Sequence, residues 1–593
     1  MHALTRSAFK IVAKLSRVVG IVVGCFSLWG QSPSDSVVPI WTQRNDNART
    51  GVNATEVLLT PATVKLNRFG KLFAYVMDDQ TYSQPLYMPG LTMASDGKKH
   101  NVVFMTTVNN SVYAFDADTN QANGGLPLWK RSLTPPGARP PNAADMSRLG
   151  ACHRQYHDFA GNMGIVGTPV IDIASNTIYL VARTIEGKRW VQRLHALDLS
   201  TGSNKLGAPV VIAAAYQGAS FDPVLNNQRP ALALVNGVVY IGWSSHCDFG
   251  AYHGWIIGYS ASDLSKVAVW SPTAFAGGTL GGIWQSGQGV AADSSGNLYL
   301  SMGNGDWDGQ NNFGMSTVKL APGVNKNKNL LVKDFFTPSN YLENLNHDID
   351  FGSAGPVLIP GTKLLIGADK QGKVFVMSQE HLGGMTEDGP DNILQEFQAI
   401  PIPPSGTQGP TNHNHGAPVY VDTGAHRYLY IWGENDFLRA FEFYGEGQRP
   451  IFSTTAVAAS AVRSPQFFTG MPGGFLSASS NKNEDGIVWA LTPYGCNANQ
   501  AVEPGILYAF DASQFQGSGA TRDLVELWDS RQNQSRDDVG YFAKFTNPTI
   551  ANGKVYVASW GDVPVDNNKC SGPTAPSNRG QLAVYGILSP TLR

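Results

Sequence analysis

Apolar and polar residues alternate along most of the chain, in short runs that end at glycine, asparagine or proline. A recurring unit closes with an Ala-Phe-Asp or Ala-Leu-Asp step and a turn, and its clearest copies lie at 111–119, 194–202 and 506–511. Two further alternating runs separated by a turn precede the step, as at 168–172 and 178–180. Because alternation with a period of two indicates strands, each unit predicts a small antiparallel sheet of four strands.

Repetition of such units along the whole chain predicts an all-β protein with the architecture of a β-propeller. We expect eight blades, with seven as the alternative if one unit has been divided. The last unit lacks a fourth strand, whereas the run at 70–76 precedes the first unit as a single strand. We therefore expect the N-terminal strand to complete the last blade and close the ring, which removes the exposed sheet edges. The expected blades lie near 81–133, 163–213, 230–272, 283–336, 350–400, 416–455, 473–529 and 546–587.

Segments rich in proline, glycine and asparagine interrupt the units at 134–162, 337–349, 400–415 and 455–472. We expect these to be loops over one face of the ring, where functional residues usually lie. The remaining organisation is simple: 31–69 is an N-terminal extension, and 70–593 is one propeller domain with loop insertions.

Composition agrees with many short strands joined by turns. The 593 residues include 64 Gly and 35 Pro, and only 15% are charged. Lys and Arg total 43 against 45 Asp and Glu, so the net charge is −2, and no basic stripe is present that could neutralise a run of phosphates. Nucleic acid is therefore excluded as an expected partner.

The first thirty residues have the pattern of an export signal. Basic residues lie among the first 17, an apolar run follows at 18–29, and 31–35 is polar. An N-terminal helix retained in the fold is the alternative. Residues 22–25 also resemble a bacterial lipobox, in which Cys25 would be lipidated and would tether the protein to a membrane. We expect a secreted, periplasmic or cell-envelope protein.

Cysteines beyond this segment are even in number, which suits an oxidising compartment. Three disulfide pairings are open, and the spacing indicates neither a zinc knuckle nor a covalently attached c-type haem. The residues are Cys152, Cys247, Cys496 and Cys570.

The middle of the chain carries a tryptophan after paired glycines, at 281–285, and then a strand and a Gly-Asn-Gly-Asp-Trp loop within 297–307. With the repeats, this resembles the pyrroloquinoline-quinone (PQQ) dependent alcohol dehydrogenases. The resemblance implies that Trp284 forms the floor under the quinone and that Asn304 helps to hold a calcium ion. Both residues have a simpler interpretation, in which Trp284 packs within a blade and the Asn-Gly pair makes a hairpin turn.

Two further segments extend the resemblance. The run 348–356 is similar to the segment that carries the catalytic aspartate of that family, and 367–376 is similar to its Lys-x-Gly strand. On this alignment Asp350 is the base that takes the proton of the substrate hydroxyl and also flanks the metal. Lys370 is the cation beside the quinone oxygens, where it favours the charge that develops on reduction.

The chain also departs from that family. No two cysteines are adjacent, Ile349 stands in place of a tryptophan, and Gly352 stands in place of a second aspartate. No early-blade glutamate is recognisable that would complete the calcium site. Calcium prefers six to eight oxygen ligands, which Asn304 and Asp350 cannot supply alone.

Histidines in the predicted loops offer a different site. Tyr156 and His157 would form an acid/base pair in a cofactor-free carbohydrate-active propeller, either a polysaccharide lyase or a hydrolase. A non-catalytic binding propeller is the third alternative. The other histidines of this set are His153, His246, His253, His347, His413 and His415.

The leading expectation is an exported quinone-dependent oxidoreductase that uses PQQ and calcium to act on alcohol or sugar hydroxyls. Because no haem motif is present, it would need a separate electron acceptor. This hypothesis requires an early-blade carboxylate that converges on Asn304 and Asp350. The carbohydrate-active alternative instead requires histidines and a tyrosine around an open polar groove.

Overall fold

A computed structural model describes residues 37–121, 124–402, 412–465, 470–561 and 579–589. The predicted export signal, with Cys25, and Cys570 lie outside the described residues. Residues Val37–Arg593 form one compact unit. Among the residues that the structure describes, no helix has the length and apolar character needed to cross a membrane.

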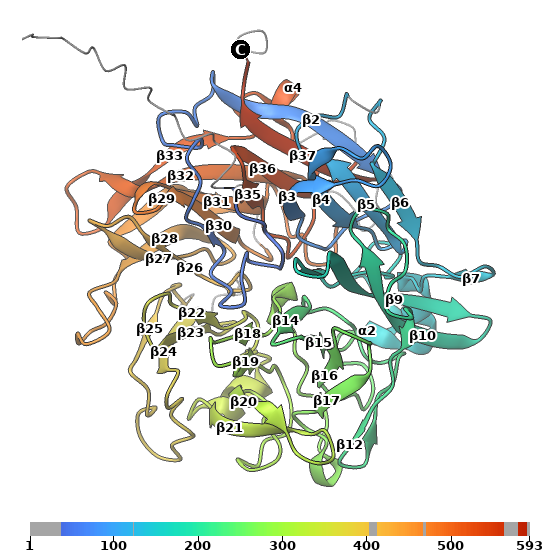
Figure 1. The fold of residues 1–593 in the computed structure, drawn as a ribbon. Coiled ribbons are helices and arrows are strands. Elements are labelled where there is room, and N and C mark those ends of the chain that lie inside the picture. Colours follow the sequence, from blue (N-terminus) through green and yellow to red (C-terminus); the bar gives the residue numbers. More distant parts are fainter. Residues whose placement is uncertain (1–36, 122–123, 403–411, 466–469, 562–578, 590–593) are drawn as a thin grey trace, which may run out of the picture. The chain divides into compact units, whose positions relative to one another are not determined.

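The first three sheets of this unit are antiparallel, and each is built from consecutive strands (Figure 1). They consist of β3 (Leu86–Thr92), β4 (Lys99–Thr106), β5 (Ser111–Asp116) and β6 (Trp129–Ser132); β7 (Ala138–Arg139), β8 (Val170–Asp172), β9 (Thr177–Glu186), β10 (Arg189–Asp198) and β11 (Val210–Val211); and β14 (Ala233–Val235), β15 (Val238–Trp243), β16 (Trp255–Ser260) and β17 (Lys266–Trp270).

The next two sheets repeat this four-stranded pattern. They consist of β18 (Ala291–Ala292), β19 (Leu298–Ser301), β20 (Thr317–Val324) and β21 (Leu330–Phe336); and β22 (Val357–Leu358), β23 (Leu364–Ala368), β24 (Lys373–Ser378) and β25 (Gln395–Gln398). A separate hairpin pairs β12 (Ala215–Tyr216) with β13 (Ala219–Ser220).

A nine-stranded sheet follows, and a five-stranded sheet ends the chain. The nine strands are β26 (Val419–Asp422), β27 (Arg427–Ile431), β28 (Asp436–Glu442), β29 (Ala458–Ser464), β30 (Phe475–Asn481), β31 (Glu484–Pro493), β32 (Gly505–Gln516), β33 (Arg522–Asp529) and β1 (Val52–Asn53). The last sheet holds β34 (Tyr541–Phe542), β35 (Thr549–Ala551), β36 (Lys554–Trp560), β37 (Gly580–Ile587) and β2 (Phe69–Met77).

The predicted all-β propeller is confirmed, and so is its closure by the N-terminal strand. β2 pairs antiparallel with β37, from Phe69 opposite Ile587 to Met77 opposite Gly580. The nine-stranded sheet owes its size to one short parallel contact between β29 and β33. Dividing it there leaves eight groups of four or more strands among the described residues, which we interpret as eight blades.

Some predicted loops contain regular elements. The segment 455–472 includes β29, which the alternating pattern did not reveal because five of its seven residues are Ala or Ser. The segments 134–162 and 337–349 also contain helices. The helices are α1 (Ala143–Leu149), α2 (Ala151–Arg154), α3 (Tyr341–Asn346) and α4 (Gln534–Asp537), with short 3-10 turns at Phe275–Gly277 and Gln285–Gly287.

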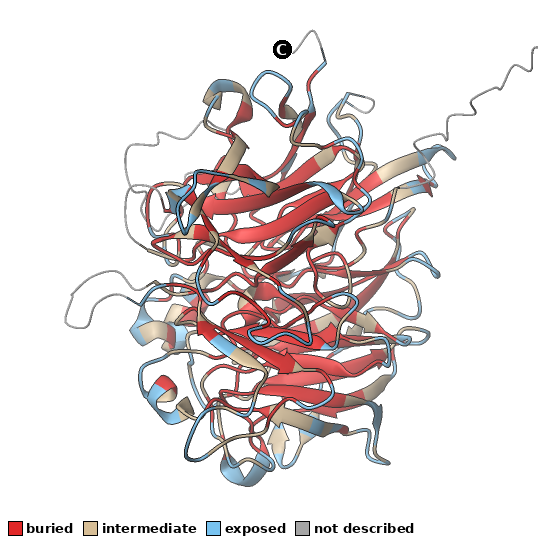
Figure 2. Ribbon diagram, turned by 90° about the vertical axis from the view of Figure 1, so that its left-hand side faces the viewer, coloured by how far each residue is buried: buried red, intermediate tan, exposed pale blue. Residues whose placement is uncertain are grey.

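The hydrophobic core lies between neighbouring sheets. Phe104 of β4 and Leu180 of β9 belong to one buried cluster, and Leu194 of β10 and Ile257 of β16 belong to another. Figure 2 shows the consequence, with buried strands throughout the unit and exposed residues concentrated in the connections. Apolar burial between sheets is the main stabilising contribution in such an arrangement.

The segment before β2 reaches the middle of the ring (Figure 1), where two fully buried arginines join it to several sheets. Arg44 donates from Nη2 to the carbonyl oxygen of Pro418 at 2.6 Å and from Nη1 to that of Leu476 at 3.3 Å. Arg49 donates from Nε to the carbonyl oxygen of Val290 at 2.9 Å. Burial lowers the pKa of Arg44 to about 10 and that of Arg49 to about 9, so both remain cations at neutral pH.

Candidate functional site

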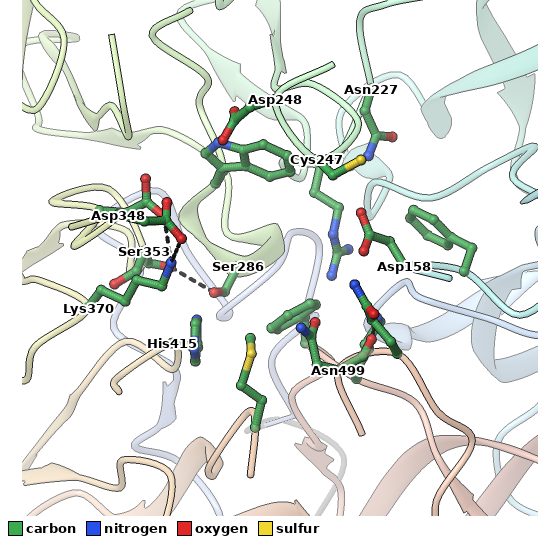
Figure 3. Close-up of a pocket in the computed structure, with 18 residues that line it drawn as sticks. Asp158, Asn227, Cys247, Asp248, Ser286, Asp348, Ser353, Lys370, His415 and Asn499 are labelled. Atoms are coloured by element: carbon green, nitrogen blue, oxygen red, sulfur yellow. Dashed lines mark hydrogen bonds and ion pairs between the residues drawn. The ribbon is translucent and has the colours of Figure 1, made fainter. Parts of the chain in front are cut away.

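A cavity of about 280 Å³ is lined by residues that lie between or after the strands of several different sheets (Figure 3). This size is close to the lower end of the roughly 300 to 1,000 Å³ typical of ligand pockets. Charged groups of both signs line it, together with aromatic residues. The predicted residues Trp284, Asp350 and Lys370 are all in the lining.

Lys370, which follows β23, joins two aspartates from the segment after α3. Its Nζ lies 2.7 Å from Oδ2 of Asp348 and 3.3 Å from Oδ2 of Asp350. The backbone N–H of Lys370 also donates to the carbonyl oxygen of Asp350 at 3.0 Å. The side chain of Asp348 is 64% exposed, whereas that of Asp350 is 18% exposed, so Asp350 is the aspartate held inside the site.

Burial raises the pKa of Asp350 to about 6, against the opposing effect of the Lys370 cation. The negative charges of Asp348 and Asp248 also raise it. A carboxyl group with a pKa near the working pH can both accept and release a proton, as a general base must. The position of Asp350 therefore suits proton transfer.

Asn304 lies directly beside this pair. Its backbone N–H donates to Oδ1 of Asp350 at 3.2 Å, and its Nδ2 donates to Oδ1 of Asp348 at 2.8 Å. The side-chain oxygen of Asn304 is buried and has no hydrogen-bond partner among the described residues. The structure thus brings the two predicted metal-flanking residues together and leaves the amide oxygen of Asn304 as an unused hydrogen-bond acceptor that could coordinate a metal ion.

Gly303 allows this close packing. A Cβ atom at this position would lie 2.6 Å from Oδ1 of Asp350 and 3.0 Å from Cδ1 of Trp284. Any larger residue would push apart the carboxylate and the indole. The glycine before Asn304 is therefore more than part of a turn signal here, because it sets the distance between two cavity residues.

Asp248 is a cavity residue that sequence reasoning missed. It lies in the loop after β15, in the third sheet, and Tyr252 donates a hydrogen bond to its Oδ1. Its charge acts on Asp350, and Figure 3 shows it lining the same cavity as Asp348. Asp248 thus brings a carboxylate of the third sheet into the lining of the cavity that also contains Asp350. The sequence contains this aspartate in the His-Cys-Asp run 246–248, of which only His246 was predicted to be a functional residue.

A disulfide also reaches the cavity. Cys152 is bonded to Cys247, with the Cα atoms 5.9 Å apart, and Cys247 lies in the lining. Cys496 is disulfide-bonded as well. The sequence showed no adjacent cysteines, and the fold instead places a disulfide beside the cavity by pairing residues that are 95 positions apart.

Two buried cations line the cavity together with the aspartates, and neither was predicted. Arg229 is 5% exposed, and its Nη1 and Nη2 atoms have no hydrogen-bond partner among the described residues. Its guanidinium lies 4.6 Å from the ring centre of Phe545. Burial lowers the pKa of Arg229 to about 10 and that of Lys544 to about 8, so both are mainly protonated at neutral pH. These groups favour an anionic ligand.

The alternative acid/base residues do not face this cavity as a pair. Tyr156 is 1% exposed, and its Oη lies 2.7 Å from Nδ1 of His246, whose Nε2 is 2.9 Å from Nη2 of Arg183. Since the guanidinium can only donate, Nε2 of His246 accepts and Nδ1–H donates to the tyrosine. His157 instead lines a separate small cavity of about 10 Å³.

Asp369, beside Lys370, gives a stability prediction. Burial raises its pKa to about 7, and it is 2% exposed. The folded state therefore holds this proton more tightly than the unfolded state, and stability falls as pH rises from about 4 to about 7. The side chain at position 369 cannot ionise in the Asp369→Asn variant. We therefore expect its free energy of unfolding, relative to that of the wild type, to increase by about 2 kcal/mol as pH rises from about 5 to about 8, as measured by urea unfolding. A difference that does not change with pH would contradict this.

Comparison with known proteins shows the same fold. The structure is similar to quinohemoprotein alcohol dehydrogenase ADHIIG from Pseudomonas putida HK5, with 14% identity, a TM-score of 0.54, and coverage of 94% of this chain and 80% of that chain. The quinohemoprotein alcohol dehydrogenase of Comamonas testosteroni is 14% identical, with a TM-score of 0.52 and coverage of 94% of this chain and 81% of that chain. A europium-containing methanol dehydrogenase is 12% identical, with a TM-score of 0.51 and coverage of 94% of this chain and 98% of that chain. No family model and no curated protein sequence matches the chain.

Proposed function

We propose that the protein is a PQQ-dependent oxidoreductase that acts on alcohol or sugar hydroxyls outside the cytoplasm. The observation that carries this proposal is that Asp248 and Asp350 line one cavity with two buried cations, and that Asn304 is hydrogen-bonded to Asp350. The propeller shared with alcohol dehydrogenases of known structure supports the proposal at the level of the fold.

The donor set fits a calcium ion. The carboxylates of Asp248 and Asp350 and the unpartnered side-chain oxygen of Asn304 are the oxygen ligands that calcium prefers. These residues would hold the ion, and oxygens of the quinone and of water would complete its coordination. Coordination of calcium by the buried amide oxygen of Asn304 would also remove the free-energy cost of leaving this oxygen without a partner.

The positively charged residues of the cavity fit the quinone. PQQ is a planar tricarboxylate, and Arg229 and Lys544 are the buried cations that would bind its carboxylates. Trp284 would supply the aromatic surface against which a planar ring system stacks. When bound, PQQ supplies an electrophilic quinone that accepts two electrons from the alcohol carbon. In this proposal Asp350 accepts the hydroxyl proton, and Lys370 stabilises negative charge beside it.

The test is to titrate the metal-free protein with PQQ and calcium while following quinone absorbance and melting temperature. We expect one PQQ per chain, bound only in the presence of calcium. Asp248→Asn and Trp284→Ala should each weaken binding by about tenfold or more, whereas Asp263→Asn, at an exposed turn, should not. A folded wild-type protein that binds no PQQ at micromolar concentration would contradict the proposal.

The other parts of the proposal concern location and electron transfer. The pattern of residues 1–30, together with the disulfide between Cys152 and Cys247, supports export to an oxidising compartment. Because the chain contains no haem-attachment motif, the electrons would pass to a separate acceptor.

A further inference from the structure

A second cluster of metal-binding side chains lies beside the cavity, apart from the oxygen donors of Asp248 and Asp350. His413, His415 and Glu434 each place one ligand atom within 4.8 Å of the others. Two imidazoles and one carboxylate are a known donor set of three-ligand zinc sites, which keep a fourth position open. Asn304 and its neighbours offer only oxygen, so the two clusters differ in their chemistry.

The backbone holds this cluster in place. The N–H of His413 donates to Oε1 of Glu434 at 3.0 Å, and the N–H of Glu434 donates to the carbonyl oxygen of His413 at 2.8 Å. The N–H of Asn414 donates to the carbonyl oxygen of Lys370 at 2.8 Å, and its own carbonyl oxygen accepts from Ser353. A site positioned in this way loses little conformational freedom when it binds an ion.

His415 supplies the observation that points to a ligand. It is 6% exposed, and its Nε2 atom has no hydrogen-bond partner among the described residues. Its ring lies edge-on to that of His413, with 6.2 Å between the ring centres. A buried ring nitrogen without a partner is unfavourable, and coordination to a metal ion is one way to satisfy an imidazole.

The charges around the cluster permit a cation. Nδ1 of His413 lies 3.2 Å from Oε1 of Glu434, so an imidazole and a carboxylate already meet in the cluster. Lys370 and Lys544 are the positive groups that act on His415. Lys370 is paired with Asp348 and Asp350, and Lys544 donates to the carbonyl oxygen of Asn499. Glu434, whose side chain is 1% exposed, provides the negative charge within the cluster.

We propose that His413, His415 and Glu434 form a binding site for a divalent transition-metal ion, best matched by Zn²⁺, in the wall of the cavity. His415 belongs both to this cluster and to the cavity lining, so the bound ion lies beside whatever occupies the cavity. Imidazole ligands select zinc or copper over calcium, which prefers oxygen alone. The inference stands independently of PQQ binding.

The experiment is calorimetric titration of the full exported protein with Zn²⁺ after treatment with EDTA. We expect about one Zn²⁺ per chain, and X-ray absorption should show nitrogen and oxygen ligands at about 2.0–2.1 Å. His413→Asn and Glu434→Gln should each weaken zinc binding by about tenfold or more. His381→Asn is the matched control, because its side chain is 69% exposed and lies outside the cluster.

The outcomes separate this site from the oxygen-rich one. Asp350→Asn should leave zinc binding unchanged, and a loss of zinc in that variant alone would overturn the assignment. So would the absence of zinc binding by the folded wild type, or equal affinities in the wild type and both cluster variants. If circular dichroism shows that Glu434→Gln does not fold, the His413→Asn variant still tests the proposal, because the His413 side chain is 25% exposed.

Discussion

Replacing Arg44 with alanine is expected to lower the free energy of unfolding by about 4 kcal/mol. The guanidinium donates to the carbonyl oxygens of Arg49, Ala417, Leu476, Thr50 and Pro418. Truncation would leave these acceptors in the middle of the ring without their donor, and it would open a cavity where Arg44 now packs. Urea unfolding followed by tryptophan fluorescence measures the loss, provided that the transition is two-state.

Two controls make this prediction specific. Arg68→Ala removes an exposed arginine from the same N-terminal region and should change stability by less than about 0.5 kcal/mol. Arg44→Lys keeps the charge but offers a single ammonium group in place of a planar fork, so it should recover only part of the loss. A loss below about 1 kcal/mol in Arg44→Ala would show that the carbonyl contacts contribute little.

The second large effect concerns Asp350, and it depends on the proposed function. Asp350→Asn should lower kcat/KM for alcohol oxidation by about 10²- to 10⁴-fold, because the amide cannot accept the hydroxyl proton. In the wild type the base must be ionised, so activity should fall as the pH decreases below about 6, the raised pKa of the Asp350 carboxyl without calcium, and bound calcium would move this fall to lower pH. Steady-state rates measured across this range with an artificial electron acceptor test both expectations.

Asp348→Asn is the matched variant for this test. Asp348 also contacts Lys370, but its side chain is largely exposed, so we expect a loss of less than about tenfold. A variant Asp350→Asn that binds PQQ and retains most of its activity would show that another group accepts the proton. Equal losses in both variants would instead indicate that the ion pairs with Lys370 are what activity requires.

The propeller could be predicted because its signals are local. Each blade repeats an alternating pattern and a turn within about fifty residues, and the unpaired run at 70–76 indicated closure. Elements without such a pattern could not be predicted. β29, in a segment expected to be a loop, consists mainly of Ala and Ser and shows no apolar alternation.

Residues of the functional site could be predicted from the sequence only where they lie in a recognisable motif. Trp284, Asn304, Asp350 and Lys370 lie in segments with recognisable neighbours. Arg229 and Asp248 lie in loops of the third sheet and Lys544 lies in a loop of the last sheet, and only the closed ring brings them to one place. The Cys152–Cys247 pairing likewise depends on how the segment between β7 and β8 of the second sheet meets the third sheet, which no spacing rule specifies.

Ring closure between β2 and β37 also has a consequence for biosynthesis. The strand that emerges early from the ribosome pairs with the strand that emerges last, and the arginine-bearing segment before it contacts sheets from the middle and the end of the chain. Contacts of such long sequence separation form slowly, and the N-terminal residues stay without their partners until synthesis is complete. Ring closure is therefore a late step in the folding of this chain, because it cannot take place before β37 has been made.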